Sequence, residues 1–323
     1  MKVLGIESSC DETAAGVVSE AGVLSDIIHT QEIHQQYLGV VPELASRAHA
    51  AKISSVVRAA LDAAGIEKPD AVAATAGPGL IGAVLVGLSF GKAAAMAWGV
   101  PFIGVNHLEG HLLSPLLEDP APSFPFLGMV VSGGHTTLYR ARALGDYEIL
   151  STTVDDAAGE AYDKVARVLG LGYPGGPPID RLAATGNPRA IAFPRPRAQG
   201  DNMSFSGLKT AVRTHCLKDD RGSDADIAAS FQAAVIDVLL DRVERAVRAT
   251  GITQIALSGG VSANGELRRR VSEMVGVEAF VPPRARCTDN ASMIAHAGRL
   301  HLLAGRRDGP GLGARSSWQL GPK

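Results

Sequence analysis

The stretch Val3-Leu4-Gly5-Ile6-Glu7-Ser8-Ser9-Cys10-Asp11-Glu12-Thr13 opens the chain with an apolar run followed by a polar turn. Its first four residues are apolar and predict a short buried strand, and residues 14–18 begin a second strand after the polar turn. A similar unit recurs midway, where residues 126–131 predict a strand, residues 132–136 a turn and residues 137–139 the return strand. A strand–turn–strand unit at the start of each half hints at an internal duplication.

A third glycine-containing turn follows another apolar run. Residues 254–257 predict a strand, residues 258–264 form the turn, and a charged helix begins near Gly265. A strand, a glycine-rich turn and a helix N-terminus together suit an anion, because backbone N–H groups and the helix dipole point at the ligand. One such loop alone is more often a tight turn without a ligand. Three such loops in one chain favour the interpretation that the protein binds a nucleotide.

Helices are expected between these strands. Residues 41–64 and 227–249 carry apolar side chains at helical spacing. Residues 72–75 and 102–105 are typical of buried strands. This alternation of strands and helices predicts an α/β fold.

The composition is that of an ordinary folded enzyme. The chain has 323 residues, 46% hydrophobic and 20% charged, which excludes a disordered chain and is enough for two domains. Aromatic residues make up only 5%, so a stacking surface for single-stranded nucleic acid is not expected. The net charge of -2 gives no global attraction to nucleic acid, so any RNA contact must use a local basic patch or a partner.

Two groups of arginines are candidates for such a patch. They are Arg189, Arg195 and Arg197 in a proline-containing loop, and Arg268, Arg269 and Arg270 on a helix. A solvated helix face explains the second group about as well. The end of the chain, residues 305–323, is rich in Gly and Arg and is expected to fray.

The cysteines and the apolar runs bear on the compartment. The chain has an odd number of cysteines, and their spacing is not that of a zinc ribbon: Cys10, Cys216 and Cys287. Such cysteine usage is typical of proteins in a reducing cytoplasm. The apolar run at the N-terminus is too short for a signal peptide. Residues 80–98 form the most apolar run, but Lys92 and several glycines predict a buried core helix and no membrane association.

The stretch His107-Leu108-Glu109-Gly110-His111 predicts a metal site. Histidines at i and i+4 lie on one face of a helix, and an acid far downstream, in Cys287-Thr288-Asp289-Asn290, would complete a 2-His-1-carboxylate set. That set suits Fe(II), with Zn(II) as a competitor. His34 and His49 are expected to be partly exposed and not ligands, and His296 is expected mainly to pack.

Two other functions compete with a nucleotide- and metal-dependent enzyme. A metalloprotease would keep the metal, but its H-E-x-x-H pattern needs Glu directly after the first His. Here Leu108 follows His107, and Glu109 lies about 100° further round the helix. A non-catalytic ATP-binding scaffold would keep the glycine turns and make the histidines incidental. Fold alone does not separate these functions.

An ordered set of motifs nearly from end to end resembles the tRNA threonylcarbamoyladenosine-forming transferases, the bacterial TsaD family, formerly described as O-sialoglycoprotein endopeptidases. Besides the opening stretch and the metal-site stretches, the matching motifs include Val41-Pro42-Glu43-Leu44-Ala45-Ser46-Arg47, Gly77-Pro78-Gly79-Leu80, Val131-Ser132-Gly133-Gly134-His135-Thr136, Tyr173-Pro174-Gly175-Gly176-Pro177, Ser204-Phe205-Ser206-Gly207-Leu208-Lys209-Thr210 and Ser258-Gly259-Gly260-Val261. One departure is Leu38, where similar proteins tend to carry Gly.

The resemblance implies two actin-like ATPase domains, each built on a ribonuclease-H-like sheet, with a nucleotide and metal cleft between them. The N-terminal domain is expected to comprise residues 1–110 and 296–323, and the C-terminal domain residues 111–295.

The resemblance also implies the site residues. The metal ligands would be His107, His111 and Asp289. The adenylate part of the substrate would contact Val131, Ser132, Gly133, Gly134, His135, Asp163, Gly176, Asp180 and Asn264. Asp11 or Glu12 is the candidate to accept a proton, because acids in the first turn would face the cleft.

The implied reaction moves a threonylcarbamoyl group from threonylcarbamoyl-AMP to the exocyclic amine of adenosine at tRNA position 37, with AMP as leaving group. The implied cofactors are one Fe(II) per subunit, or Zn(II), and bound ATP or threonylcarbamoyl-AMP. The implied partners are tRNA, a shorter actin-fold paralogue (TsaB-like) and a small P-loop ATPase (TsaE-like). The apolar helix over residues 80–98 is a candidate docking face for the paralogue.

Overall fold

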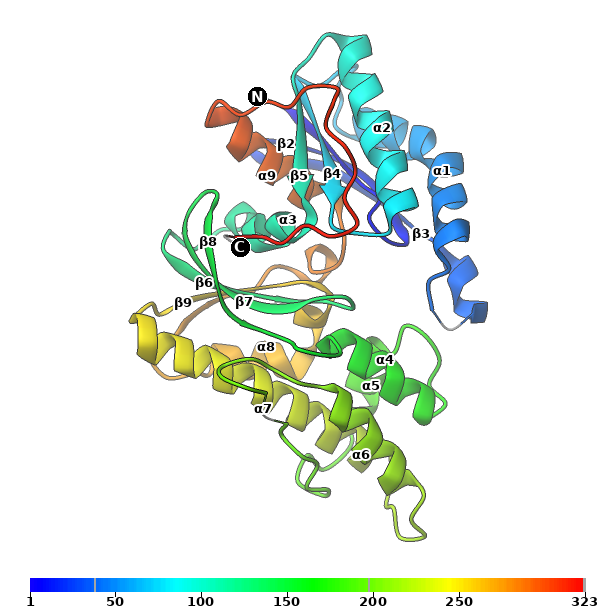
Figure 1. Cartoon of the computed structure of the whole chain (residues 1–323), viewed down its shortest axis with the longest axis vertical. Helices are drawn as coiled ribbons and strands as arrows, with labels where there is room; N and C mark the ends of the chain where they lie inside the picture. The colour runs from blue at the N-terminus through cyan, green and yellow to red at the C-terminus, as the bar shows by residue number, and fades with distance from the viewer. Residues whose placement is uncertain (38, 197, 322–323) are drawn as a thin grey trace. The chain divides into compact units, whose positions relative to one another are not determined.

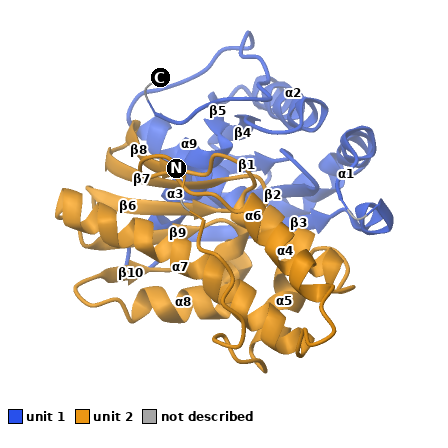
Figure 2. Ribbon diagram, turned by 60° about the horizontal axis from the view of Figure 1, so that its bottom comes forward, with its two compact units in different colours: residues 1–121, 289–323 blue, residues 122–288 orange. Residues whose placement is uncertain are grey.

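The computed structural model describes residues 1–37, 39–196 and 198–321, so Leu38 and Arg197 lie outside the described residues. By its contacts the chain divides into two compact units: unit 1 comprises residues 1–121 and 289–323, and unit 2 residues 122–288 (Figure 2). The domain boundaries expected from the sequence, after residues 110 and 295, concern domains that fold independently, and they stay a prediction. The division by contacts places His111 and Asp289 together in unit 1.

Unit 1 is built on a mixed sheet. Its strands are β1 (Val3–Glu7), β2 (Glu12–Ser19), β3 (Gly22–Thr30), β4 (Ala71–Gly77) and β5 (Phe102–Asn106). The strand order is β3-β2-β1-β4-β5, with β1–β2 and β2–β3 antiparallel and β1–β4 and β4–β5 parallel. The strands β1, β4 and β5 are buried along their whole length, as expected for apolar strands of a sheet covered on both faces.

Helices cover both faces of this sheet. They are α1 (Pro42–Ala63), α2 (Ile81–Trp98), the short α3 (His107–Leu113) and α9 (Ala291–Leu303). Figure 1 shows α1 and α2 on one side of the sheet and α9 on the other. Successive residues of β1 face opposite sides of the sheet and therefore meet different helices. A Cβ at Gly5 would lie 2.2 Å from the carbonyl oxygen of Ala291 in α9, whereas Ile6 lies against Gly91 of α2.

Only one face of α2 is buried, so the expected core helix is confirmed for that face alone. Ile81, Leu85 and Met96 are each more than half exposed. By length and composition α2 is the one helix of the described residues that could cross a membrane, and 33% of it is buried. Lys92 donates from Nζ to the carbonyl oxygens of Pro310 and Leu312.

The sheet of unit 2 repeats the pattern of unit 1. Its strands are β6 (Phe126–Val131), β7 (Thr136–Ala143), β8 (Asp146–Thr152), β9 (Gln254–Ser258) and β10 (Glu278–Phe280). Read from β8, the order is β8-β7-β6-β9-β10, with two antiparallel pairs followed by two parallel pairs. The shared topology agrees with the duplication that the sequence hinted at.

The helices of unit 2 supply most of its core. They are α4 (Ala158–Val168), α5 (Gly176–Ala183), α6 (Ser206–Cys216), α7 (Asp224–Thr250) and α8 (Gly265–Ser272). The long α7 begins where the Ser223 hydroxyl accepts the amide of Asp226, and it ends at Gly251 with φ +72°. Its Phe231 and Val235 pack in one cluster with Leu127 and Met129 of β6.

Candidate metal centre and nucleotide-binding turns

Asn106 decides where the helix that carries the two histidines begins. It is the last residue of β5, and its side-chain Oδ1 accepts the amides of Leu108 at 2.9 Å and Glu109 at 3.4 Å. This cap satisfies backbone donors that have no partner within the helix. The helix therefore starts at His107, one turn before His111, and the two imidazole rings lie edge to face with centroids 4.8 Å apart.

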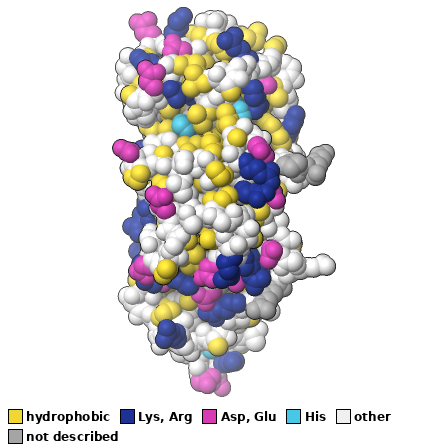
Figure 3. All heavy atoms as spheres, turned by 90° about the vertical axis from the view of Figure 1, so that its left-hand side faces the viewer, with side chains coloured by type: hydrophobic (Ala, Val, Ile, Leu, Met, Phe, Trp, Pro, Cys, Tyr) yellow, Lys and Arg dark blue, Asp and Glu magenta, His cyan; other side chains and the backbone are white. Residues whose placement is uncertain are grey.

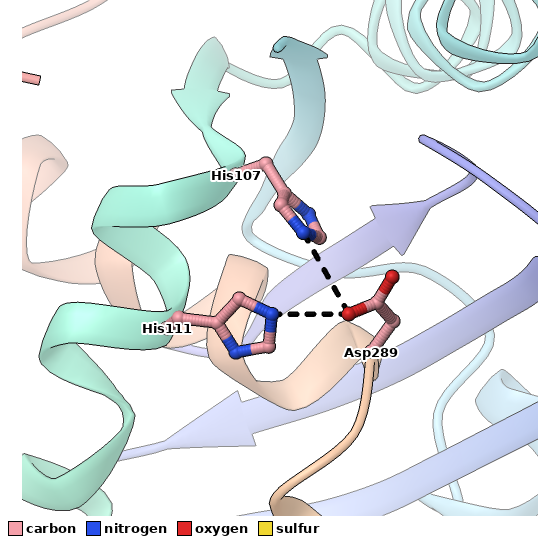
Figure 4. A group of neighbouring side chains, drawn as sticks. All are labelled: His107, His111 and Asp289. Atoms are coloured by element: carbon pink, nitrogen blue, oxygen red, sulfur yellow. Dashed lines mark hydrogen bonds and ion pairs between the residues drawn. The ribbon is translucent and has the colours of Figure 1, made fainter. Parts of the chain in front are cut away.

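Asp289 reaches the same point from the other end of the chain. It precedes Asn290, whose side chain caps α9 by accepting the amide of Met293 at 2.9 Å. Its Oδ1 lies 3.0 Å from Nε2 of His111 and 3.6 Å from Nε2 of His107 (Figure 4). The three sequence-predicted ligands thus offer atoms that all lie within 4.8 Å of one another.

A fourth residue, Glu7, stands behind His107. It is fully buried at the end of β1, and its Oε2 lies 2.9 Å from Nδ1 of His107. The Thr75 hydroxyl donates to the same oxygen at 2.6 Å, and the Ser9 amide donates to Oε1. With Nδ1 donating to Glu7, Nε2 faces Asp289. Sequence reasoning gave Glu7 no role, although an acid ending a buried apolar strand signals a partnered carboxylate.

The electrostatics of the Glu7–His107 pair favour the ionised forms. Burial opposes ionisation of both groups, but the imidazole of His107 lowers the pKa of Glu7 below its ordinary value. Burial would likewise lower the pKa of His107, yet the carboxylates of Glu7 and Asp289 outweigh it and raise that pKa to about 9. A cation that binds Nε2 of His107 must therefore displace a proton.

The donor set fits a divalent cation. An ion about 2.1 Å from two ligands in tetrahedral or octahedral geometry separates them by about 3.0–3.4 Å, close to the two Asp289 distances. When His111 donates from Nε2 to Asp289, its buried Nδ1 has no hydrogen-bond partner among the described residues. If Nδ1 carries the proton instead, the Nε2 lone pair faces a carboxylate, a repulsion that a cation between them would remove.

Glu109, the acid expected of a protease at a neighbouring position, has a different partner. Its Oε1 lies 2.8 Å from Nε2 of His301 in α9, and both side chains are buried. This pair joins α3 to α9, the helix that follows Asp289. Glu109 is therefore a structural link between the elements that carry the ligands.

The two candidate proton acceptors lie in and after the first turn. Asp11 is in the turn, and its backbone carbonyl accepts the amide of Gln31. Glu12 is the first residue of β2; burial raises its pKa well above the ordinary value, and the nearby carboxylates of Asp289 and Asp11 add to the effect. The buried imidazole of His49 contacts residues on both sides of Asp11 and Glu12, namely Cys10 and Thr13.

The expectation that His34 and His49 are partly exposed is wrong, since both are buried. His49 lies 2.7 Å from the Thr13 hydroxyl and 2.9 Å from the carbonyl oxygen of Cys10. His34 lies 2.9 Å from the side-chain oxygen of Gln31. These contacts give the polar ring nitrogens hydrogen-bond partners inside unit 1, which offsets the free-energy cost of burying them.

The turn after β6 in unit 2 has the form of an anion cradle. Val131 ends the strand, the Ser132 amide donates to the carbonyl of His135 at 2.7 Å, and the His135 amide donates to the Ser132 hydroxyl at 3.1 Å. Gly133 and Gly134 at its tip are exposed, with no atom within 4 Å of a Cβ built on either. Their backbones are open to a ligand, as a phosphate requires.

The other predicted substrate residues of unit 2 form two pairs. Asp163 in α4 accepts the amide of Gly175 at 2.7 Å, directly before Gly176, the first residue of α5. Asp180 in α5 accepts the amide of Gly265 at 3.0 Å, and the neighbouring Asn264 caps α8 by accepting the amide of Leu267. Each of these side chains thus also shapes a loop.

Asn264 is further held by a partner that the sequence did not indicate. Its Nδ2 donates to the side-chain oxygen of Gln232 in α7 at 2.7 Å, and both residues are buried. Gln232 thereby fixes which end of the Asn264 amide faces α8. The interaction joins positions 32 residues apart, so no local pattern predicts it.

Three of the six arginines considered for RNA binding are paired with acids. Arg195 and Arg270 both bind Asp237, and Arg269 binds Glu266 and Glu273. Arg268 donates to the carbonyl oxygens of Ser262 and Pro282. Figure 3 shows acidic side chains interspersed with basic ones on the face in view. Two arginines of the helix group thus have acidic partners, and Arg268 has backbone partners only.

Comparison with known proteins places the chain in a family. A family model described as TsaD, tRNA N6-adenosine threonylcarbamoyltransferase, matches residues 22–296. The tRNA N6-adenosine threonylcarbamoyltransferase of Anaeromyxobacter dehalogenans (strain 2CP-C) is 51% identical over 332 residues, covering 99% of this chain and 99% of the relative.

Solved structures of low identity show the fold. Full-length HypF has a TM-score of 0.64 at 14% identity, covering 93% of this chain and 55% of HypF. Component A of the (R)-2-hydroxyglutaryl-CoA dehydratase of Acidaminococcus fermentans has a TM-score of 0.58 at 14% identity, covering 94% and 99%. The expected actin-like ATPase fold is confirmed. The family match and the half-identical relative show that this chain belongs to the TsaD family of tRNA N6-adenosine threonylcarbamoyltransferases.

Proposed function

We propose that this chain transfers the threonylcarbamoyl group of threonylcarbamoyl-AMP to the exocyclic amine of adenosine 37 in tRNAs that read codons beginning with adenine. A new C–N bond forms to the carbonyl carbon, the C–O bond to the phosphate breaks, AMP leaves, and the amine loses one proton. The observation that carries the proposal is the convergence of His107, His111 and Asp289 in a chain of the TsaD family.

These three residues would hold one Fe(II) per subunit, with Zn(II) as the alternative. Two imidazoles and one carboxylate with open positions are the ligand set preferred by non-haem Fe(II). When bound, the ion supplies Lewis-acid polarisation of the substrate's carbonyl oxygen or threonyl end. Glu7 supports the proposal, because its bond to Nδ1 keeps Nε2 of His107 directed at Asp289.

The nucleotide part of the substrate, or ATP, would bind unit 2. Gly133 and Gly134 at the exposed tip of the turn would receive the phosphate, and Val131, Ser132 and His135 would flank it, with the Ser132–His135 hydrogen bonds fixing the shape of the turn. Gly176 begins α5 and Asn264 caps α8, and Asp163 of α4 and Asp180 of α5 hold these two helix starts by accepting the amides of Gly175 and Gly265. These four residues would contact the remainder of the nucleotide. Their internal hydrogen bonds preorganise these loops, which lowers the cost of binding.

Glu12 would accept the proton of the attacking amine, with Asp11 as the alternative. An aryl amine is a weak nucleophile, so removing its proton in step with attack lowers the barrier. The raised pKa of Glu12 supports this role, because a carboxylate with a higher pKa is a stronger base.

The proposed partners are tRNA, a TsaB-like paralogue and a TsaE-like ATPase, in the cytoplasm. The apolar exposed face of α2, with Ile81, Leu85 and Met96, is the surface we assign to the paralogue. The three cysteines are free, which suits a reducing compartment.

Transfer of labelled threonylcarbamoyl from its adenylate to unmodified tRNA tests the proposal. Wild type, His111→Ala and the control His29→Ala, a half-buried histidine of β3, are compared with and without the partners, and bound metal is measured in each. We expect label on tRNA for wild type and His29→Ala only. No transfer by wild type with partners present would reject the reaction. Transfer by metal-free His111→Ala would reject the role of the metal.

A further inference from the structure

The C-terminal strap, residues 308–318, lies against β5, the end of β4 and α2 of unit 1, and Figure 1 shows it in red between β4 and α2. This contradicts the expectation that residues 305–323 fray, at least through residue 318. The Asp308 amide donates to the carbonyl of Phe102 at 2.9 Å, and Oδ2 of Asp308 accepts the amide of Gly104 at 2.9 Å. Nδ2 of Asn106 donates to the carbonyl of Trp318 at 3.1 Å. The strap thus binds one backbone group each of Phe102 and Gly104 and the side chain of Asn106, three alternate residues of the edge strand β5.

Further contacts hold the strap between these points. The Arg315 amide donates to the carbonyl of Ala76 at 2.9 Å, and the Gly79 amide donates to the carbonyl of Ser316 at 3.3 Å. Lys92, the charged residue in the apolar face of α2, binds two strap carbonyls.

Apolar packing adds to these hydrogen bonds. Leu312, Ala314 and Trp318 pack against the core of unit 1. A Cβ at Gly104 would lie 2.1 Å from Cδ2 of Leu312, so Leu312 fills the space that a side chain at position 104 would otherwise occupy. The Arg315 guanidinium lies over the Trp318 ring, 4.7 Å from its centroid. The strap is therefore an integral layer of unit 1.

Asn106 connects the strap to the metal centre. Its Oδ1 caps α3, its Nδ2 is held by Trp318, and it precedes the ligand His107. The side chain is 2% exposed, so without the Trp318 carbonyl its amide would be a buried donor lacking this partner. The Trp318 carbonyl also selects one of the two amide orientations. Turned by 180°, the amide would present NH₂ to the Leu108 N–H, and the cap would be lost.

We propose that the C-terminal strap is a positioning element of the metal centre, acting through Asn106. The Trp318 carbonyl fixes the amide of Asn106, the amide fixes the first turn of α3, and that turn directs His107 toward Asp289. This inference rests on the proposed metal centre. It makes Asn106 a positioning residue and assigns a role to a segment remote in sequence from every ligand except Asp289.

Truncation tests the proposal. A chain ending at Ser316 loses the Trp318 carbonyl but keeps the Arg315 and Ser316 contacts, and a chain ending at Leu320 is the matched control. The dissociation constants for Zn(II) and Fe(II) are measured by competition with a chromophoric chelator. We expect about 10-fold weaker binding after Ser316 and no change after Leu320. In metal-free protein, the amides of Leu108 and Glu109 should exchange faster with solvent after the shorter truncation only.

Substitutions at Asn106 show whether the strap acts through this residue. Asn106→Ala should weaken metal binding as much as the truncation at Ser316 does, and the two changes together should weaken it no further. Asn106→Ser keeps a capping oxygen without the strap bond, so it should bind metal near the wild-type affinity and be insensitive to the truncation.

Several outcomes would overturn the proposal. Unchanged metal affinity and amide exchange in a folded chain ending at Ser316 would reject the strap while leaving the metal centre intact. Independent, multiplicative effects of truncation and Asn106→Ala would show that the strap acts elsewhere. If truncation prevents folding, the full-length Asn106→Ala and Asn106→Ser variants still decide: equal affinities of the two would reject the role of the cap. Wild type that binds neither metal would reject the proposed metal centre itself.

Discussion

Glu7 is the residue on which the orientation of His107 depends. A fully buried carboxylate is costly unless it is paired and hydrogen-bonded, and Glu7 has partners on both oxygens. A carboxylate behind a ligating histidine fixes its tautomer and raises its basicity. Glu7 therefore belongs to the metal centre although it need not touch the ion.

Replacing Glu7 by Gln should weaken binding of Zn(II) and Fe(II) by about 10- to 100-fold, because a neutral amide lacks the charge that holds the imidazole and has one acceptor oxygen where Glu7 uses two. The measurement is a chelator competition at neutral pH. Glu43→Gln, at an exposed acid near the start of α1, is the matched control and should bind as wild type does. Equal affinities of Glu7→Gln and wild type would show that Nδ1 of His107 needs no carboxylate.

His296 makes unit 1 sensitive to acid. It is buried in α9, and its Nε2 has no hydrogen-bond partner within the described part of the chain. Burial, and then Arg299, lower its pKa from 6.5 to about 4. Between these values the unfolded state binds more protons than the folded state, so the free energy of unfolding falls as the pH falls from 6.5 to 4. The loss amounts to about 3 kcal/mol.

His296→Leu should lose less stability on acidification than wild type, by about 2–3 kcal/mol between pH 7 and pH 4.5. At pH 7 the change should be small, since an apolar group replaces a buried polar atom without a partner. Urea unfolding of both proteins at the two pH values measures the difference. The same acid-induced loss in both proteins would assign the sensitivity to other groups.

At the scale of elements, the metal centre depends on the packing of α3 against α9. The Glu109–His301 pair joins the two helices inside unit 1, with Oε1 of Glu109 2.8 Å from Nε2 of His301. Either change, Glu109→Ala or His301→Ala, should lower the free energy of unfolding by about 2–3 kcal/mol, because the other member of the buried pair is left without this hydrogen-bond partner. The double variant should lose clearly less than the sum. Strict additivity would mean that the pair does not couple the helices.

At the scale of the whole molecule, the two units share a sheet topology but differ in the ligands proposed for them. The residues proposed to hold the metal all belong to unit 1, and the turns proposed to hold the nucleotide belong to unit 2. A cation that bridges α3 and the start of α9 should therefore stabilise unit 1 selectively.

Zn(II) at about 100 times its dissociation constant should stabilise the metal-binding fold by about 2.7 kcal/mol. Hydrogen exchange should slow in α3 and at the start of α9, and stay unchanged in α7 of unit 2. A chelator should reverse the effect, and His111→Ala should abolish it. Equal protection of α7 would show that the ion acts elsewhere than at His107, His111 and Asp289.

The sequence alone was enough to predict the strands β1, β2, β4, β5, β6, β7 and β9, the helices α1, α2, α7 and α8, and the family, but not β3, β8, β10 or the helices α4 to α6. These follow from local periodicity, from the i, i+4 spacing of His107 and His111, and from an ordered series of motifs. Local periodicity also explains the error at the C-terminus: a Gly- and Arg-rich segment has no regular pattern, yet its backbone finds partners on an edge strand.

The contacts of Glu7 and Trp318 with the metal helix emerged from the tertiary structure alone: Glu7 and His107 are 100 residues apart, and Asn106 and Trp318 are 212 apart. The family resemblance had already implied Asp289, which lies 178 residues from His111 and which no local pattern places beside it. The pairing of Arg195 and Arg270 with Asp237 likewise came from the structure alone. Side chains separated in this way meet only where the path of the chain through the sheet brings their strands and helix ends together, and no periodicity within a single segment encodes that path.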